Sequence, residues 1–213
     1  PTNTASGAMP WLTISTGAIA LLIHLMPGAI VETLQYSRNG LANGTLWQIL
    51  TGHLTHWNLN HLIADLAVFG LLGSMVESKS RKCLALLLAG SAILISASVY
   101  IMLPGIEYYR GLSGIDMALA GFVILDNLIQ SRRKSGRIES ILWTIALLGL
   151  FAKPAVEMAL SHPIFIQDLG ANVVGLPAPH FVGAFVGIAV LLITPAYRDH
   201  GHHSKSTEYA ALP

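Results

Sequence analysis

A serine between glycines is the first residue in this chain whose surroundings point to chemistry. Ser113 lies in the sequence Gly111-Leu-Ser-Gly114, at the start of a long apolar run. A serine at a helix N-terminus lies beside backbone N–H groups that have no helical partner, and such groups can bind the oxyanion of an acyl transfer. The flanking glycines let a substrate approach the backbone closely. The alternative is a simple helix cap, because serine is a common N-cap residue.

A histidine at the start of another apolar run is the second candidate. His180 begins the sequence His-Phe-Val-Gly-Ala-Phe-Val-Gly. Histidine inside a membrane span costs free energy and marks a candidate functional residue. Gly183 and Gly187 form a GxxxG pattern, which allows helices to pack closely in lipid. Gly183 is one turn from His180, so a neighbouring helix can approach the imidazole. The alternative is a histidine at the level of the lipid headgroups.

A third group of polar residues follows the pattern H-x4-H-x3-D. It consists of His56, His61 and Asp65, and the last two share a helix face because they are four residues apart. Together with His53 the spacing H-x2-H-x4-H raises the alternative of a metal site. The HExxH pattern is absent, and no carboxylate lies at ligand spacing from two of these histidines. We therefore predict no metal here.

Three charged residues lie inside the apolar runs. Lys153 and Glu157 are four residues apart next to Pro154. Charges at such depth usually pair with each other, so we predict a structural ion pair. The alternative is that the pair holds the active-site cavity or a substrate. Asp116 lies one turn into its run, where it is either protonated or in contact with the water of an open cavity.

The elements that position these residues follow from composition. Of the 213 residues, 53% are hydrophobic and only 11% are charged, whereas soluble domains carry about 25% charged residues. Uncharged apolar runs of about 20 residues predict membrane-spanning helices. We expect one all-α, polytopic membrane domain over residues 1–213, in contact with the lipid bilayer. The predicted spans are 11–31, 60–76, 83–103, 113–129, 140–160 and 179–197. The net charge of +1 gives no indication of nucleic-acid binding.

Basic residues predict the orientation of these spans. They follow the second, fourth and sixth runs, as Lys79, Arg81, Lys82, Arg132, Arg133, Lys134, Arg137, Arg198 and Lys205. The alternate loops contain only Arg38 and Arg110. By the positive-inside rule both termini are cytoplasmic, and the candidate residues share a depth near the outer face. The first run lacks a basic flank, so we expect no cleavable signal peptide.

Taken together, these motifs resemble the rhomboid family of intramembrane serine proteases. The resemblance covers about residues 47–197 and rests on the order of the GxSG serine, the histidine followed by G-x3-G, and the H-x4-H-x3-D stretch. It implies a six-transmembrane-helix rhomboid-like bundle in which Ser113 is the nucleophile and His180 the general base of a two-residue dyad. It also implies that the Ser113 N–H and His61 bind the oxyanion. The surrounding oxyanion and substrate-binding region comprises Asp65, His56, Gly111 and Gly114.

The sequence departs from the family pattern at two positions. Asp65 stands where rhomboids usually have Asn, and an ionised carboxylate would repel an oxyanion. We therefore predict that Asp65 is a neutral donor or an orienter of His61. Met117 stands where many rhomboids have an aromatic residue packed on the catalytic histidine, and its adaptable apolar side chain can fill that space. No carboxylate is placed to complete a triad, and the mechanism needs no cofactor.

The resemblance implies hydrolysis of a peptide bond in the transmembrane or juxtamembrane segment of a membrane-anchored protein substrate. The compact chain, the stretch WQILTGHLTH and the Lys-x3-Glu motif are similar to bacterial rhombosortases. That similarity implies processing of C-terminal GlyGly-CTERM sorting tails at the bacterial inner membrane. One alternative is an inactive relative that binds membrane clients, against which both Ser113 and His180 argue. Another is a small transporter, for which no inverted repeat is evident.

Overall fold

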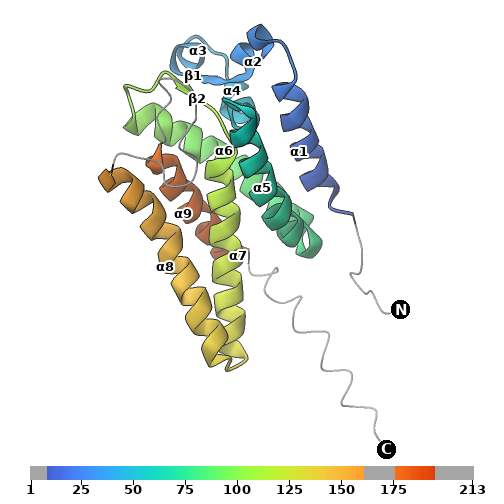
Figure 1. The fold of residues 1–213 in the computed structure, drawn as a ribbon, viewed down its shortest axis with the longest axis vertical. Coiled ribbons are helices and arrows are strands. Elements are labelled where there is room, and N and C mark those ends of the chain that lie inside the picture. The colour runs from blue at the N-terminus through green and yellow to red at the C-terminus, as the bar shows by residue number, and fades with distance from the viewer. Residues whose placement is uncertain (1–8, 161–175, 195–213) are drawn as a thin grey trace, which may run out of the picture.

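The computed structural model describes residues 9–160 and 176–194, and these residues form a helical bundle. Successive long helices run in opposite directions along the bundle (Figure 1). The long helices are α1 (Trp11–His24), α5 (Leu59–Lys79), α6 (Arg81–Met102), α7 (Ser113–Arg133), α8 (Arg137–Leu160) and α9 (Pro177–Ile193). Residues 195–197, the predicted end of the sixth span, lie outside the described part of the chain.

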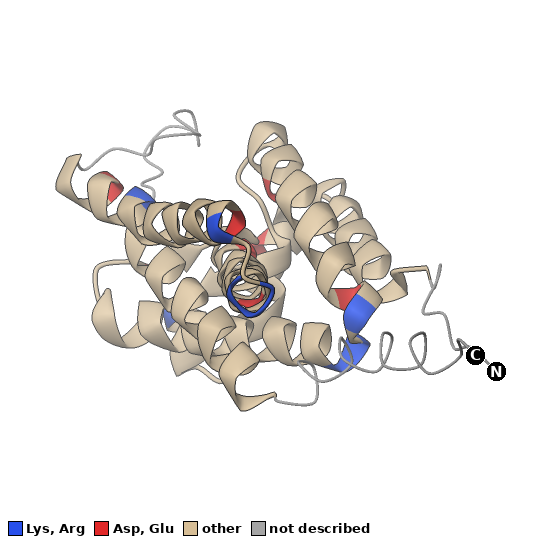
Figure 2. Ribbon diagram, turned by 90° about the horizontal axis from the view of Figure 1, so that it is seen from below, with Lys and Arg blue, Asp and Glu red and all other residues tan. Residues whose placement is uncertain are grey.

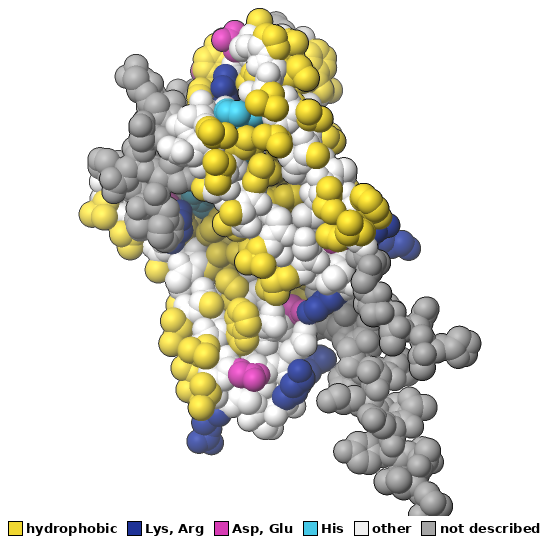
Figure 3. Space-filling view, turned by 45° about the vertical axis from the view of Figure 1, so that its right-hand side comes forward, with side chains coloured by type: hydrophobic (Ala, Val, Ile, Leu, Met, Phe, Trp, Pro, Cys, Tyr) yellow, Lys and Arg dark blue, Asp and Glu magenta, His cyan; other side chains and the backbone are white. Residues whose placement is uncertain are grey.

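The outside of the bundle is apolar enough for a bilayer. In the described part of the chain, four helices have the length and composition to cross a membrane, namely α5, α6, α7 and α8. The remaining apolar helices, α1 and α9, are shorter. Hydrophobic side chains are spread over the face drawn in Figure 3, and many large ones such as Leu71 and Leu148 are exposed. The prediction of an all-α, multi-pass membrane protein is confirmed, while the number of six spans stays a prediction.

The first predicted span, 11–31, is wrong as a single helix. The helix α1 ends at His24, and a separate helix α2 (Gly28–Leu34) begins after Pro27. Pro27 has ψ 141°, an extended conformation, and its ring nitrogen has no hydrogen to continue the helical ladder. The apolar run therefore turns instead of crossing in one piece.

The polar segment that follows contains short elements instead of a purely irregular loop. These are β1 (Tyr36–Ser37), α3 (Arg38–Ala42), α4 (Gln48–Thr51) and the 3-10 helix Gly52–Leu54. β1 pairs antiparallel with β2 (Tyr108–Tyr109), which ends shortly before α7. Nη2 of Arg38 also donates to the carbonyl oxygens of Tyr100 at 2.7 Å and Leu103 at 3.0 Å. Because the last carbonyls of a helix lack helical partners, Arg38 fastens this segment to the end of α6.

Close contact between α7 and α9 is the feature that positions the candidate residues. A Cβ atom at Gly183 would collide with the carbonyl oxygen of Gly114, and one at Gly187 would collide with that of Ala118. The GxxxG pattern therefore brings backbone against backbone, as the sequence predicts. α7 is also the most buried of the four spanning helices, so its N-terminal serine starts inside the bundle.

The basic clusters lie at the opposite end of the bundle from Ser113. The connections α5–α6 and α7–α8 lie at this end, where Figure 2 shows Lys and Arg residues. Lys79 joins the end of α5 to α7 through a contact of 2.9 Å between Nζ and Asp126 Oδ2. The basic clusters at these connections are therefore separated from Ser113 by the length of α7.

Candidate active site

Ser113 and His180 lie within hydrogen-bond distance of each other. The Oγ atom of Ser113 is 3.1 Å from Nε2 of His180, although the residues are 67 positions apart. Ser113 is the first residue of α7, and His180 lies in the first turn of α9. The backbone contact at Gly183 holds these two helix starts together. With the imidazole lone pair on Nε2, this geometry allows proton transfer from the serine hydroxyl.

The turn before Ser113 requires glycine. Gly111 has φ +117°, a left-handed conformation that side chains disfavour. A Cβ atom there would also lie 2.7 Å from the Nε2 atom of His61. The next residue, Leu112, donates its N–H to Asp65 Oδ2 at 2.8 Å. The backbone that leads into α7 is therefore fixed by both conformation and a buried hydrogen bond.

Asp65 is the centre of a buried polar cluster. Its Oδ2 atom lies 3.1 Å from Nε2 of His56 and 3.3 Å from Nε2 of His61, in addition to the Leu112 N–H. The two imidazole rings meet edge to face at 5.1 Å. Burial lowers the pKa of His56, an effect that the neighbouring Asp65 opposes. One oxygen accepts the Leu112 N–H and faces two imidazole nitrogens, an arrangement suited to orienting His61, and the choice between this role and a neutral donor stays a prediction.

This cluster also affects how an oxyanion can be bound. His61 Nε2 faces Asp65 in the structure, so it must turn to serve as an oxyanion donor. The N–H of Ser113 needs no such movement, because the first N–H groups of a helix have no helical acceptor. We therefore expect the backbone N–H of Ser113, at the start of α7, to be the main hydrogen-bond donor to the oxyanion.

His53 does not join His56 and His61. Its Nε2 atom lies 3.2 Å from both the Ala92 carbonyl and the Ser96 hydroxyl of α6. Burial lowers the pKa of His53 to about 4. The H-x2-H-x4-H spacing, which suggested a metal site, thus does not bring three imidazoles together. The described residues contain no group of three His, Cys, Asp or Glu that could hold a metal ion.

A carboxylate lies beside His180, and the sequence analysis missed it. Lys153 and Glu157 pair as predicted, with Nζ–Oε distances of 2.8 and 3.0 Å. The Oε2 atom of Glu157 is also 3.6 Å from Nδ1 of His180. The sequence placed no carboxylate to complete a triad, whereas the structure brings Glu157 to within ion-pair distance of His180. A signal was present, since the predicted topology brings the end of the fifth span and the start of the sixth to the same side of the membrane.

Two further polar residues surround the start of α7. The hydroxyl of Tyr109 is 3.2 Å from the place that a Cβ atom on Gly114 would take, and burial raises the pKa of Tyr109. Nothing in the sequence pattern singled out this tyrosine. Asp116 is buried, and its Oδ1 atom has no hydrogen-bond partner among the described residues. The alternative that leaves Asp116 in contact with water in an open cavity stays a prediction.

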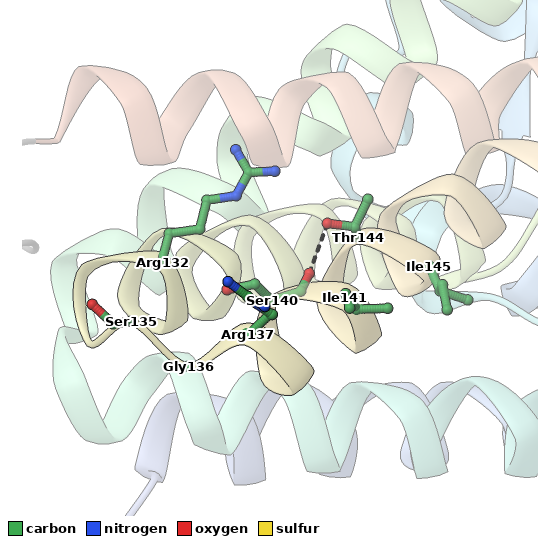
Figure 4. A pocket seen from close by; sticks show the side chains of 8 residues that line it. All are labelled: Arg132, Ser135, Gly136, Arg137, Ser140, Ile141, Thr144 and Ile145. Atoms are coloured by element: carbon green, nitrogen blue, oxygen red, sulfur yellow. Dashed lines mark hydrogen bonds between the residues drawn. The ribbon is translucent and has the colours of Figure 1, made fainter.

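A pocket between the end of α7 and the start of α8 is separate from these residues. Figure 4 shows its lining, which includes Arg132, Arg137 and Thr144. Thr144 Oγ1 donates to the carbonyl of Ser140 at 2.7 Å, which satisfies both groups within α8. No predicted site residue lines this pocket, and it lies at the other end of α7 from Ser113.

Comparison with known proteins covers this same part of the chain. A family model described as Rhomboid domain matches residues 43–196, more than half of the sequence. The matched region includes Asp65, Ser113, Glu157 and His180. No curated protein matches the chain.

Proposed function

The chain belongs to the rhomboid family, and from this premise we propose that it is an intramembrane serine endopeptidase that uses Ser113 and His180. The observation that carries the proposal is the distance of 3.1 Å between Ser113 Oγ and His180 Nε2. Members of this family act on membrane proteins within the bilayer. The substrate is accordingly a membrane-anchored protein that is cut in or beside its transmembrane segment.

The mechanism follows from the two side chains and the helix start. His180 Nε2 takes the hydroxyl proton as Ser113 Oγ attacks the carbonyl carbon. The backbone N–H of Ser113 stabilises the negative oxygen. The imidazolium then gives its proton to the leaving amine, which breaks the peptide bond and leaves an acyl-serine. Water, deprotonated by His180, hydrolyses this ester and restores the serine.

The distribution of charge supports an orientation for this chemistry. Basic residues gather at the α5–α6 and α7–α8 connections, and the positive-inside rule places that end in the cytoplasm. Ser113 and His180 begin helices at the other end, so the site opens to the outer side. In a bacterium this membrane is the inner membrane.

Covalent labelling with a fluorophosphonate tests the proposal. The purified wild type should be labelled, and Ser113→Ala should not be. The matched control is Ser98→Ala, which removes a buried hydroxyl on α6 that donates to the Ile95 carbonyl at 2.7 Å. Labelling of Ser113→Ala would show that another nucleophile reacts. An unlabelled wild type that still binds membrane clients would favour the inactive relative.

The finer assignment within the proposal is a rhombosortase. The compact chain, the WQILTGHLTH stretch and the Lys153–Glu157 motif support it. A pair of substrates that share one transmembrane anchor, with and without the GlyGly motif of a CTERM tail, tests this assignment. Preferential cleavage of the GlyGly substrate is expected, and equal rates would leave a general rhomboid protease.

A further inference from the structure

We propose that Glu157 is a positioning residue for His180, so that the site works as a serine–histidine–glutamate array with Lys153 behind it. This inference rests on the proposed function, because it concerns how the base of that reaction is held. It adds a third member to a site that the sequence predicts to have two.

The geometry around the imidazole carries the proposal. One ring nitrogen of His180, Nε2, lies 3.1 Å from Ser113 Oγ, and the other, Nδ1, lies 3.6 Å from Glu157 Oε2. The Nδ1 atom is buried and has no hydrogen-bond partner among the described residues. The Glu157 side chain is 6% exposed, so its carboxylate faces the bundle and not the lipid. Serine and glutamate therefore occupy the two opposite sides of one imidazole.

A carboxylate in this place has two chemical effects. It favours the tautomer with the proton on Nδ1, which leaves the Nε2 lone pair free to take the serine proton. It also stabilises the imidazolium that forms during the attack. The separation of 3.6 Å is longer than a hydrogen bond. Catalytic contacts of this kind often shorten in the substrate complex, and here the positive charge on His180 attracts the carboxylate.

Lys153 limits how strongly the Glu157 carboxylate stabilises the His180 imidazolium. Its Nζ atom contacts both carboxylate oxygens, at 2.8 and 3.0 Å. The ammonium compensates the charge of Glu157 within the membrane and holds its position. The same positive charge opposes the formation of an imidazolium, so the pair acts on His180 more weakly than a lone carboxylate.

Packing between α8 and α9 keeps the carboxylate in place. Phe151 of α8 contacts Phe181 and Phe185 of α9, with ring centroids 6.4 and 5.0 Å apart. The glutamate is less than two turns further along α8. The helix α8 thereby holds Glu157 beside the first turns of α9.

Apart from Asp116 and Lys153, the other charges on the helices that pack against α9 lie at the end of the bundle away from His180. On α7 the only other titratable group near Ser113 is Asp116, one turn further along. On α6 the charged residues are Arg81 and Lys82, in its first turn at the opposite end of the bundle. Toward the outer end lie Tyr100 of α6, Tyr108 and Tyr109 of β2, and the histidines His56 and His61 beside Asp65. Among the described residues Glu157 is the carboxylate that lies against His180, so the pH profile of turnover should respond to its removal.

The test measures kcat, KM and their pH dependence for Glu157→Gln, using a transmembrane substrate in detergent or liposomes. We expect kcat to fall by about 10- to 100-fold, a part of the contribution of a general base, with KM little changed. Because the carboxylate stabilises the imidazolium, its removal should move the acidic limb of the pH profile to lower pH. Glu157→Asp should restore part of kcat.

Two further variants separate positioning from stability. Asp126→Asn is the matched control, because it removes the buried carboxylate of the other described Lys–carboxylate pair, 2.9 Å from Lys79. It should leave the pH profile unchanged. The double variant Glu157→Gln, Lys153→Met leaves no lone ammonium in the membrane and decides the matter if the single variant does not fold.

The outcomes distinguish this inference from the proposed function. Wild-type turnover that needs Ser113, together with wild-type kcat and pH profile in the glutamine variants, would overturn the role of Glu157 alone. Turnover by Ser113→Ala would overturn the proposed function itself. If Glu157→Gln lowers kcat and shifts the acidic limb of the pH profile while Asp126→Asn does neither, the role of Glu157 is established.

Discussion

Helix α5 carries two buried carboxylates, one toward each end, and they are held in different ways. Glu77 accepts hydrogen bonds from the N–H groups of Leu12 and Thr13 at 2.9 and 2.8 Å, and from the Thr13 hydroxyl at 2.9 Å. Arg81 completes its partners at 2.9 Å. Glu77 thereby caps the start of α1 and fixes it to α5.

Asp65 is equally buried but has partners of another kind. Two of its three partners are the imidazoles of His56 and His61, and the third is the N–H of Leu112. Backbone amides, hydroxyls and guanidinium groups act only as donors to a carboxylate, whereas an imidazole nitrogen can donate or accept a proton. Burial alone therefore does not distinguish a structural carboxylate from one that belongs to a reactive site. The chemical identity of its hydrogen-bond partners does.

The largest effects should come from the two residues nearest the reaction. Ser113→Ala and His180→Ala should each lower turnover by about 1000-fold or more, because no other group in the site can replace nucleophile or base. The double variant should lose no more than either single one, since the residues act as a unit. Thermal stability should stay close to that of the wild type. Substantial turnover by either purified variant would reject the mechanism.

Substitution of Glu77, at the other end of α5 from Asp65, should lower stability but not activity. Glu77→Ala removes the acceptor of two backbone donors and one hydroxyl of α1. A buried donor left without a partner costs about 1–3 kcal/mol, so the melting temperature in detergent should fall clearly. The activity of the molecules that remain folded should be retained. Glu139→Ala, an exposed glutamate on α8, is the control. An unchanged melting temperature would show that Glu77 does not stabilise the contact between α1 and α5.

Substitutions of Asp65 should give an intermediate effect. Asp65→Asn keeps an oxygen that can accept the Leu112 N–H, so it should keep most of the activity. Asp65→Ala leaves that N–H without an acceptor, yet it should lose less than the roughly 100-fold expected for a principal oxyanion donor. Rates measured against pH for both variants test this order. Inactivity of the asparagine variant at every pH would mean that an ionised Asp65 is essential.

The smallest expected effect is a loss of folding stability at low pH that is caused by the burial of His53. Its pKa falls from 6.5 in the unfolded chain to about 4 when buried, so between these values the unfolded state binds more protons. Stability is therefore complete above pH 6.5 and declines as pH falls toward 4. Between pH 8 and pH 6 the loss should be about 1 kcal/mol. Unfolding of wild type and His53→Gln at both pH values checks this, and equal losses would show that His53 is not the cause.

Much of the fold could be predicted because it depends on long-range averages of the sequence. Uncharged runs of sufficient length predicted the spanning helices α5 to α8, and their order brought Ser113 and His180 to one end. The break at Pro27 was missed because the run 11–31 is apolar throughout. The Pro27-Gly28 pair inside it, a typical turn sequence, was the local signal for the end of α1.

The missed parts of the site depend on contacts that no motif records. The bond from Leu112 to Asp65 comes from a backbone N–H, which every residue except proline possesses. The approach of Glu157 to His180 depends on how α8 packs against α9. Periodicity predicts which residues share a helix face, but it does not give the rotation of one helix against another.

The glycine contacts between α7 and α9 have a mechanical consequence. Backbone atoms already touch at Gly183 and Gly187, so the two helices cannot be pressed closer together. We therefore expect a change in bilayer thickness to tilt α7 and α9 together. The 3.1 Å spacing of Ser113 and His180 should then depend little on the lipid, and a change of acyl-chain length should act on substrate entry instead.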